Sequence, residues 1–307
     1  MRFVLASLLL GIVTVAGCAD PEQFHGCLSN DDCGGAPCVA GWCSTAPRDL
    51  SVGGGTTAID QAGHVTTDGG ATTLCSPNHD GVIDRDEIVV LVGAGPGYAV
   101  NTPGTTVPVS LEAHNGVWDF SAPPDYQGGS EQQAFDQLLS AQGQWWSPDF
   151  PSASYAMQAP GGQDLLIVMR STAEGEEALG YVSQSNQATE LTYDHPIPLW
   201  QFPLAAGKQW TATANVTGRV DYVAVVESET WELLVTARGT TKVPLGTFDS
   251  LQLRIHVTQT IGLQQTTRYI YQHVAECYGQ LARIRSQDNE ASPDFTTAAE
   301  RRRLALP

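Results

Sequence analysis

The sequence predicts a mainly β protein, folded as an antiparallel sandwich or an open curled barrel and preceded by a small disulfide-rich module and a flexible linker. Three observations predict this class. Short runs that alternate apolar and polar residues dominate 88–286, turn residues separate these runs, and no long helical period interrupts them. Many closely spaced strands are typical of sandwiches and barrels. We therefore expect one β domain over 88–286, with 88–195 and 196–286 as halves if it divides.

Residues 1–17 have the parts of a secretion signal: a basic Arg2, an apolar stretch and small residues before Cys18. The stretch is too short to span a membrane, so we expect the chain to be exported. Val15-Ala16-Gly17-Cys18 resembles the lipobox of bacterial lipoproteins. This resemblance implies cleavage before Cys18, a diacylglycerol on its sulfur and an acyl chain such as palmitate on its new amine. The alternative is an ordinary signal peptide followed by a chance cysteine.

Lipidation of Cys18 would make a membrane the first partner of the chain. Several acyl chains hold far more firmly than one, because burial of each CH2 group is worth about 0.8 kcal/mol. Ala19, rather than an acidic residue, follows the anchor. In the resembling family this points to the cell outer membrane, where the chain would face the periplasm or the cell exterior.

The six other cysteines are expected to form three disulfides, because an exported chain meets an oxidising environment. Four of them crowd into the anchored module 18–43: Cys27, Cys33, Cys38 and Cys43. Three pairings are open, and our choice is the interleaved one, Cys27 with Cys38 and Cys33 with Cys43. A zinc site is the alternative, although Cys-x-x-Cys pairs are missing. Cys75 and Cys277 would form the third bridge, worth roughly 5 kcal/mol in chain entropy.

Residues 44–74 are rich in Gly, Thr, Ala and Ser and show no apolar period. Glycine clusters at 53–55 and 69–70 favour flexibility. We expect this segment to be a flexible linker that holds the folded domain away from the lipid surface.

The formal net charge of −18 limits the partners of the chain. A surface of this sign repels phosphate backbones, so nucleic acid is not an expected partner. Cationic ligands, metal ions and neutral surfaces remain, and so does the simpler interpretation that acidity keeps an exported protein soluble.

Residues 76–87 resemble the loop of an EF-hand, and with Cys75 they form an expected calcium loop over 75–87. Calcium takes six to eight oxygen ligands, which this loop supplies from its positions one, three, five, seven, nine and twelve. The residues at these places are Ser76, Asn78, Asp80, Val82 (through its carbonyl), Asp84 and Glu87. Gly81 stands at the sixth place, where the chain must turn. Ser76 replaces the usual aspartate, so a structural Ca2+ of low to moderate affinity is expected; the alternative is a solvated Asp-Gly turn.

The strand pattern is clearest where Leu251, Leu253, Ile255, Val257 and Ile261 fall on one side of a two-residue period. The other predicted strands are 164–171, 178–183, 189–193, 222–237, 268–275 and 280–286. Residues 131–140 suit a short helix. A second short helix is expected in the C-terminal tail 287–307, capped by Asp294 and ending near Arg301, Arg302 and Arg303. A basic nucleic-acid patch is the less favoured interpretation of these arginines.

Catalytic signatures are missing from the sequence: it has no Gly-x-Ser-x-Gly elbow, no His-Glu-x-x-His, no phosphate-binding loop and no dinucleotide fingerprint. His256 and His273 lie on predicted strands and with Glu276 would form a cluster if their strands were neighbours; two unrelated polar side chains are the simpler interpretation. Aromatic side chains are the other candidates for a ligand groove, although each is more often core. These are Trp118, Trp145, Trp146, Tyr155, Trp200, Trp210 and Trp231.

Two motifs in the second half carry a further resemblance. Pro203-Leu204-Ala205-Ala206-Gly207-Lys208-Gln209-Trp210 and Val243-Pro244-Leu245-Gly246-Thr247-Phe248 resemble a pattern of bacterial exported proteins of unknown function. The resemblance covers about 197–286 and implies a curled antiparallel sheet with a concave face, akin to that of periplasmic lipoprotein carriers.

These observations predict an outer-membrane lipoprotein whose β domain has a non-enzymatic structural or binding role. The alternative is a carrier or sensor of an apolar ligand or glycan within the curled sheet, which would make a lipid, a glycan or a protein its partner. A hydrolase is less favoured, because it would need histidine and carboxylate side chains that converge in an open cleft.

Overall fold

The computed structural model describes residues 75–93, 95–124, 130–159 and 164–305, together with the backbone of five short strands nearer the N-terminus. The chain divides into two compact units, Met1–Val52 and Gly53–Pro307. The predicted signal segment, Cys18 and the pairing of Cys27, Cys33, Cys38 and Cys43 lie outside the described residues. In the first unit, β1 (Cys38–Val39) and β2 (Trp42–Cys43) form an antiparallel pair.

The expected linker 44–74 contains regular structure, which corrects the prediction. A three-stranded antiparallel sheet is formed by β3 (Ala58–Ile59), β4 (His64–Thr67) and β5 (Gly70–Thr73). Threonine and valine in β4 favour strands even beside the neighbouring glycines, and the overall composition of the segment does not show this.

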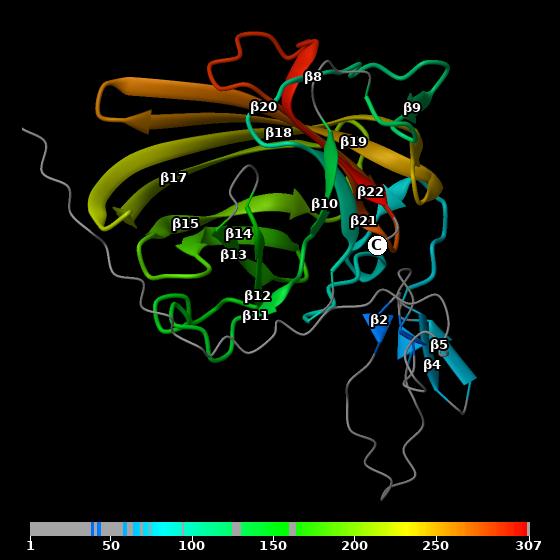
Figure 1. The fold of residues 1–307 in the computed structure, drawn as a ribbon, viewed down its shortest axis with the longest axis horizontal. Coiled ribbons are helices and arrows are strands. Elements are labelled where there is room, and N and C mark those ends of the chain that lie inside the picture. The colour runs from blue at the N-terminus through cyan, green and yellow to red at the C-terminus, as the bar shows by residue number, and fades with distance from the viewer. Residues whose placement is uncertain are drawn as a thin grey trace, which may run out of the picture. The chain divides into compact units, whose positions relative to one another are not determined.

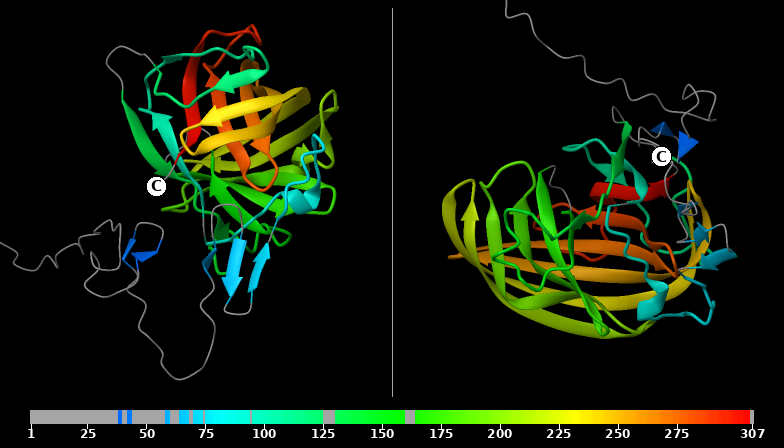
Figure 2. Two further views of the ribbon diagram at one scale, coloured as in Figure 1. Left: turned by 90° about the vertical axis from the view of Figure 1, so that its right-hand side faces the viewer. Right: turned by 90° about the horizontal axis from the view of Figure 1, so that it is seen from below.

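The predicted fold class is confirmed: in the described residues, fifteen strands form one open sheet (Figures 1 and 2). Its order is β10-β7-β22-β21-β20-β19-β18-β17-β15-β14-β13-β12-β11, with β8 added beside β22 and β9 beside β18. Neighbours are antiparallel except for β9, which runs parallel to β18. The strands are β7 (Gly97–Asn101), β8 (Val107–Pro108), β9 (Val117–Asp119), β10 (Glu131–Phe135), β11 (Leu139–Ser140), β12 (Tyr155–Gln158), β13 (Leu165–Ser171), β14 (Gly175–Ser183), β15 (Glu190–Gln201), β17 (Gln209–Val220), β18 (Val223–Val243), β19 (Gly246–Ile261), β20 (Gln264–Ala275), β21 (Gly279–Ser286) and β22 (Thr297–Ala305).

Long hairpins form the middle of this sheet. Pro244 and Leu245 separate β18 from β19, as the Val-Pro-x-Gly motif predicts. β15 runs through the proposed boundary at 195, so the sheet is continuous and the division into halves is not observed.

Two helix predictions are wrong. Residues 131–140 form β10 and β11, and the C-terminal tail forms β22, which lies between β21 and β7. The arginines at 301–303 are therefore interior residues of the sheet, each less than a tenth exposed. The described residues contain one 3-10 turn, η2 (Arg85–Glu87), and no α-helix. None of them belongs to a helix with the length and apolar character needed to cross a bilayer.

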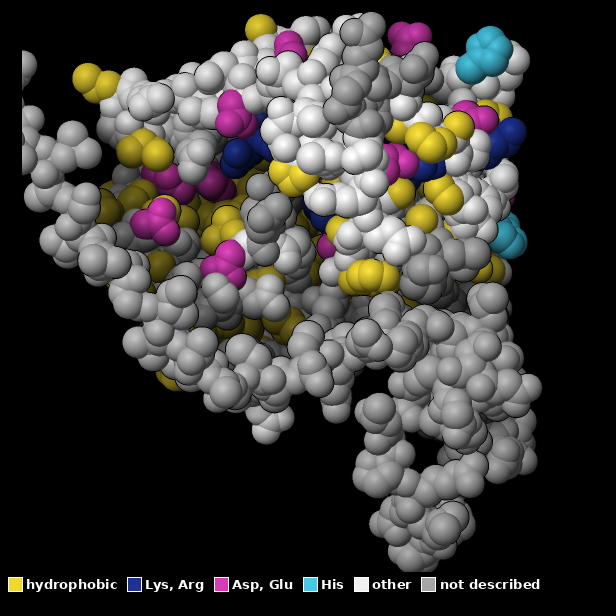
Figure 3. Space-filling model, viewed as in Figure 1, with side chains coloured by type: hydrophobic (Ala, Val, Ile, Leu, Met, Phe, Trp, Pro, Cys, Tyr) yellow, Lys and Arg dark blue, Asp and Glu magenta, His cyan; other side chains and the backbone are white. Residues whose placement is uncertain are grey.

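The curled sheet has two faces with different coverings. We call the face that carries Trp231, Ile255 and Ile270 the inner face. Residues of β12–β20 meet there in one core, and Figure 3 shows a hollow with apolar side chains inside and acidic side chains around its opening. The outer face carries Tyr271 and Ile284 and is covered by segment 107–120, so it is more buried than the sequence pattern predicts.

Candidate functional site

The predicted calcium loop is fastened firmly to the sheet. The disulfide between Cys75 and Cys277 is confirmed, with a Cα–Cα distance of 5.6 Å. The backbone N–H of Cys277 donates to the carbonyl of Glu87 at 2.7 Å. β6 (Val82–Ile83) pairs with β16 (Leu204–Ala205), and Ile83 is buried at the eighth place of the loop. The bridge thus joins the start of the described β domain to the β20–β21 turn, 202 residues later.

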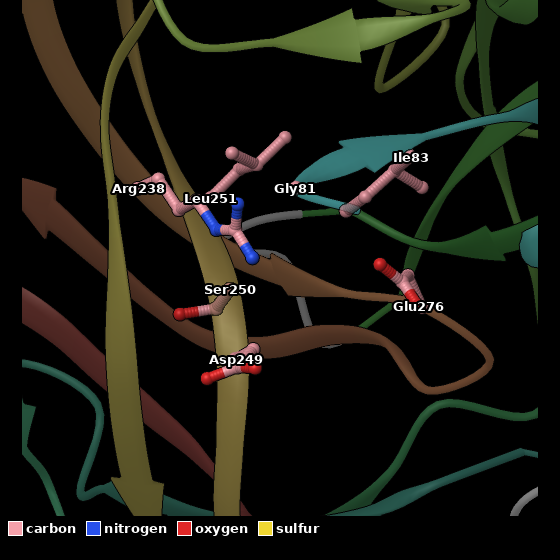
Figure 4. Close-up of a pocket in the computed structure, with 7 residues that line it drawn as sticks. All are labelled: Gly81, Ile83, Arg238, Asp249, Ser250, Leu251 and Glu276. Carbon is pink, nitrogen blue, oxygen red and sulfur yellow. The ribbon is translucent and has the colours of Figure 1, made fainter. Parts of the chain in front are cut away.

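Arg238 holds the turn of the loop from outside. Its Nη1 donates to the carbonyl of Asp80 and its Nη2 to the carbonyl of His79, both at 3.1 Å. Figure 4 shows Arg238 with Gly81 and the other residues that line a small cavity at this place. Gly81 has a φ of +89°, and a Cβ there would lie 2.0 Å from the guanidinium. Glycine is therefore favoured by the backbone, and a side chain at this position would also have to displace the end of the Arg238 side chain. A cavity of about 10 Å³ remains beside Glu276, which is room for about one water.

The predicted ligands of the loop are bonded mainly to its own backbone. Asn78 Oδ1 accepts from the N–H of Asp80, and Asp80 Oδ1 accepts from the N–H of Val82, both at 2.8 Å. Glu87 Oε2 accepts from the N–H of Asp84 at 2.9 Å. Within the described ranges, no three His, Cys, Asp or Glu side chains gather closely enough to hold a metal. The turn therefore fits the motif, whereas the carboxylates are not collected around one point.

Negative charge nevertheless accumulates near Glu87. Burial raises the pKa of its carboxyl, and Glu276, Asp80 and Asp84 raise that pKa further, against the hydrogen bond from the Asp84 backbone. A cation bound nearby would lower this repulsion.

The inner face contains a cavity of about 80 Å³ that the sequence did not reveal. Its wall is mainly apolar and comes from β12, β13, β14, β15, β18, β19, β20 and β21. The apolar and aromatic lining residues are Tyr155, Met157, Ile167, Met169, Leu199, Trp200, Trp231, Ile255 and Ile270. Three of the seven aromatic candidates thus line it. Of the others, Trp118 and Trp146 are buried in separate cores, whereas Trp145 and Trp210 are half-buried beside core clusters.

A few polar groups are set into this apolar wall. The carboxylate of Glu176 accepts from the hydroxyls of Ser171 and Tyr155, the latter at 3.0 Å, and lies 3.5 Å from Arg85 Nη2. Burial raises the pKa of Glu176, although these partners act in the opposite direction. Arg85 belongs to η2, so it connects the calcium loop to the cavity wall. Such a mixture of apolar surface and few polar groups is typical of small-molecule sites.

A ladder of buried charges continues the inner face beyond the cavity. Arg283 Nε donates to Glu300 Oε1 at 2.7 Å, and Arg302 forms an ion pair with Asp136. A second cavity of about 270 Å³ is lined by Arg302, Asp136 and Arg285. Gln158 lines both cavities, so the two are adjacent.

The histidine cluster considered above does not form. His273 is fully buried, its Nδ1 lies 3.1 Å from Thr241 Oγ1, and it packs edge-on against Trp118. His256 instead lies 2.7 Å from Glu232 Oε2 and stacks on Tyr269. Glu276 accepts a hydrogen bond from the backbone of His79. The three residues therefore have three separate sets of contacts.

Comparisons with known proteins add little to this geometry. No family model matches the chain, and no curated protein matches it. Among solved structures, the chain is similar to a protein of Bacteroides fragilis NCTC 9343 that is presumed to be exported and has a YmcC-like fold. The identity is 9%, the alignment covers 70% of this chain and 96% of that chain, and the TM-score is 0.33. At so loose a superposition, the assignment of function depends on the residues of the chain itself.

Proposed function

We propose that the chain is an exported lipoprotein, anchored through Cys18 in the outer membrane, that binds a small ligand with an apolar body and catalyses no reaction. The observation that carries the proposal is the apolar cavity of the inner face, with Trp200 and Trp231 in its wall. Burial of a ligand's apolar surface there would supply affinity, and the few polar groups would orient it. This makes the chain a carrier or sensor.

The ligand-binding part is tested with four-carbon probes, which match the volume of the cavity. We expect butan-1-ol or butanoate to bind saturably and to change the fluorescence of the tryptophans in the cavity wall. Ile255→Phe would fill the cavity and abolish binding. Ile261→Phe is the matched control, because Ile261 lies on the same strand but is 50% exposed. Failure of both probes to bind the wild-type chain would overturn the proposal.

The anchor is tested separately. Mass spectrometry of the mature N-terminal peptide should show three acyl chains on a peptide that begins at Cys18. An unmodified thiol, or an intact signal segment, would contradict the lipoprotein assignment.

We propose further that the 76–87 loop binds calcium in a structural role. The spacing of Ser76, Asn78, Asp80, Val82, Asp84 and Glu87, the turn at Gly81 and the negative charge around Glu87 support this. For a dissociation constant on the order of 0.5 mM, 5 mM calcium would stabilise the fold by about 1.4 kcal/mol.

Calorimetric unfolding with millimolar calcium and with a chelator tests the calcium site. Asp80→Ala should remove the calcium-dependent shift, whereas Asp249→Ala, an exposed carboxylate next to the loop but outside the motif, should keep it. An unchanged midpoint in the wild-type chain would eliminate the calcium proposal.

A further inference from the structure

Two buried hydrogen-bond donors on the inner face are without a partner, and they define the chemistry of the ligand. We propose that the apolar ligand of the 80 Å³ cavity carries an anionic group, in the simplest case a carboxylate, which binds Arg283 and Gln280. This inference rests on the proposed binding function and specifies its ligand class.

A β-bulge brings the two donors to the same face. In the β20–β21 ladder, Gln272 is paired with Arg283 and Val274 with Gln280, so Leu281 is an additional residue without a partner. Residues three positions apart in a regular strand point to opposite faces. Because of the bulge, Gln280 and Arg283 both lie on the inner face and both line the cavity.

Both donors have unused hydrogen-bonding capacity. Arg283 Nη2 and Gln280 Nε2 are buried and make no hydrogen bond. Arg283 as a whole is only 2% exposed, so bulk solvent does not reach its free N–H group. A buried donor without an acceptor is destabilising. An acceptor placed in the cavity would recover this cost, and an anionic one would form a charge-assisted bond to the guanidinium.

The charges around the cavity favour an anion over a cation. The ladder contains three guanidiniums, on Arg283, Arg285 and Arg302, and two buried carboxylates, on Glu300 and Asp136. The other acid nearby, Asp288, pairs with Arg285 from an exposed position. Glu176 in the cavity wall is paired with Arg85 at 3.5 Å, and buried Glu229 is bonded to Trp231 on β18. Around Arg283 on β21, guanidiniums therefore outnumber buried carboxylates, although the whole chain carries a charge of −18.

The rest of the cavity wall favours a ligand whose apolar part lies next to its anionic group. Trp200, Trp231, Ile255 and Ile270 form its wall, and Trp200 Nε1 is already bonded to Gln272 Oε1 at 3.1 Å. A short alkyl chain or a small ring attached to a carboxylate matches both parts of the site.

The decisive experiment compares three probes with the same four-carbon chain: butanoate, butan-1-ol and butylammonium. Isothermal titration of the wild-type protein should show butanoate binding at least ten-fold more tightly than butan-1-ol, with the ammonium weakest. Equal or tighter binding of butan-1-ol would overturn the inference but leave the proposed function standing. Absence of binding by all three would overturn both.

Substitutions test whether Arg283 causes the preference for an anionic probe. Arg283→Met should bring the affinity ratio of butanoate to butan-1-ol close to one, whereas Arg254→Met, on the same sheet but in the outer-face groove beside His256, should keep the wild-type ratio. If Arg283→Met does not fold, Gln280→Leu provides the second test, with an expected several-fold decrease in the ratio. An unchanged ratio in a folded Arg283→Met protein would show that the anion binds elsewhere and would contradict the inference.

Discussion

The two faces of the β20–β21 hairpin each bury a nitrogen without a hydrogen-bond partner, and they differ in what surrounds it. On the outer face, His273 Nε2 lies without a partner among aromatic rings, with the ring centres of Trp118 at 4.8 Å and Phe120 at 5.0 Å. On the inner face, Arg283 Nη2 is equally buried, but Arg283 lines a cavity.

This difference separates a structural residue from a binding one. A histidine can lose its proton, and burial lowers the pKa of His273 to about 3, so the ring is neutral and tolerates its apolar surroundings. An arginine keeps its proton in proteins, so Arg283 stays charged. Glu300 satisfies one edge of its guanidinium, and the other edge is available to a ligand.

The largest loss of stability is expected when the covering of the outer face is removed. Trp118→Ala deletes a large side chain that is 3% exposed, and it should lower the free energy of unfolding by about 4 kcal/mol. Denaturant unfolding measures this loss. Trp145→Ala, at a half-buried tryptophan in another cluster, is the control and should cost clearly less. Equal losses would mean that segment 107–120 does not cover a true core.

On the inner face, Glu300→Gln should cost about 3 kcal/mol, because it leaves the buried guanidinium of Arg283 without its carboxylate. Chemical denaturation compares it with Glu112→Gln, an exposed control. The double variant Arg283→Met, Glu300→Leu should regain part of this stability. If the double variant is no more stable than Glu300→Gln, the charge of Arg283 is not the cause of the loss.

Acid should lower the stability of the protein through His273 on the outer face. Because its folded-state pKa is lowered from 6.5 to about 3, the unfolded chain binds more protons over this range. Stability from this group is fully present above pH 6.5 and decreases as the pH falls toward 3. By pH 5.5 the loss relative to neutral pH is about 1.4 kcal/mol. Unfolding as a function of pH should be flatter in His273→Leu, and an identical slope would contradict the assignment.

The smallest effect is expected at Glu176, with the opposite sign. Its folded-state pKa is raised, chiefly by burial, so its stabilising contribution is present in acid and is lost as the pH rises through that pKa. Glu176 faces Tyr155, Ser171 and Arg85, with Glu177 as a further nearby charge. Glu176→Gln should therefore be more stable than the wild type at neutral pH, and the difference should disappear toward pH 4. Thermal unfolding at both pH values checks this sign.

The sequence predicted features that depend on local pattern and missed those that depend on both faces of the sheet. In β19 the alternation of Leu251, Leu253 and Ile255 correctly indicated a strand, because one face is strongly apolar. The sequence of β22 instead predicts a helix, because four consecutive charged residues, 300–303, hide the alternation of the strand. Their burial depends on Glu131 and Asp136, residues far away in the sequence.

The candidate site likewise has one part that the sequence predicts and one part that it does not. The bridge between Cys75 and Cys277 was predicted from redox environment and cysteine number alone. The inner cavity was not, because it depends on the curl of the sheet and on a bulge at Leu281 that brings Gln280 and Arg283 to one face, neither of which leaves a local signal. Three of its aromatic residues were among the candidates, but nothing in the pattern distinguished them from core tryptophans.

The position of β22 has a consequence for the newly made protein. β7 obtains its neighbour on one side only when residues 302–305 arrive, because Val100 is paired with Arg302. During synthesis, the early strands must therefore wait for the late ones, and chaperones would have to shield their apolar surfaces meanwhile. Proteolytic trimming of β22 would likewise separate β7 and β10 from β21, so the damage would extend beyond the trimmed segment itself.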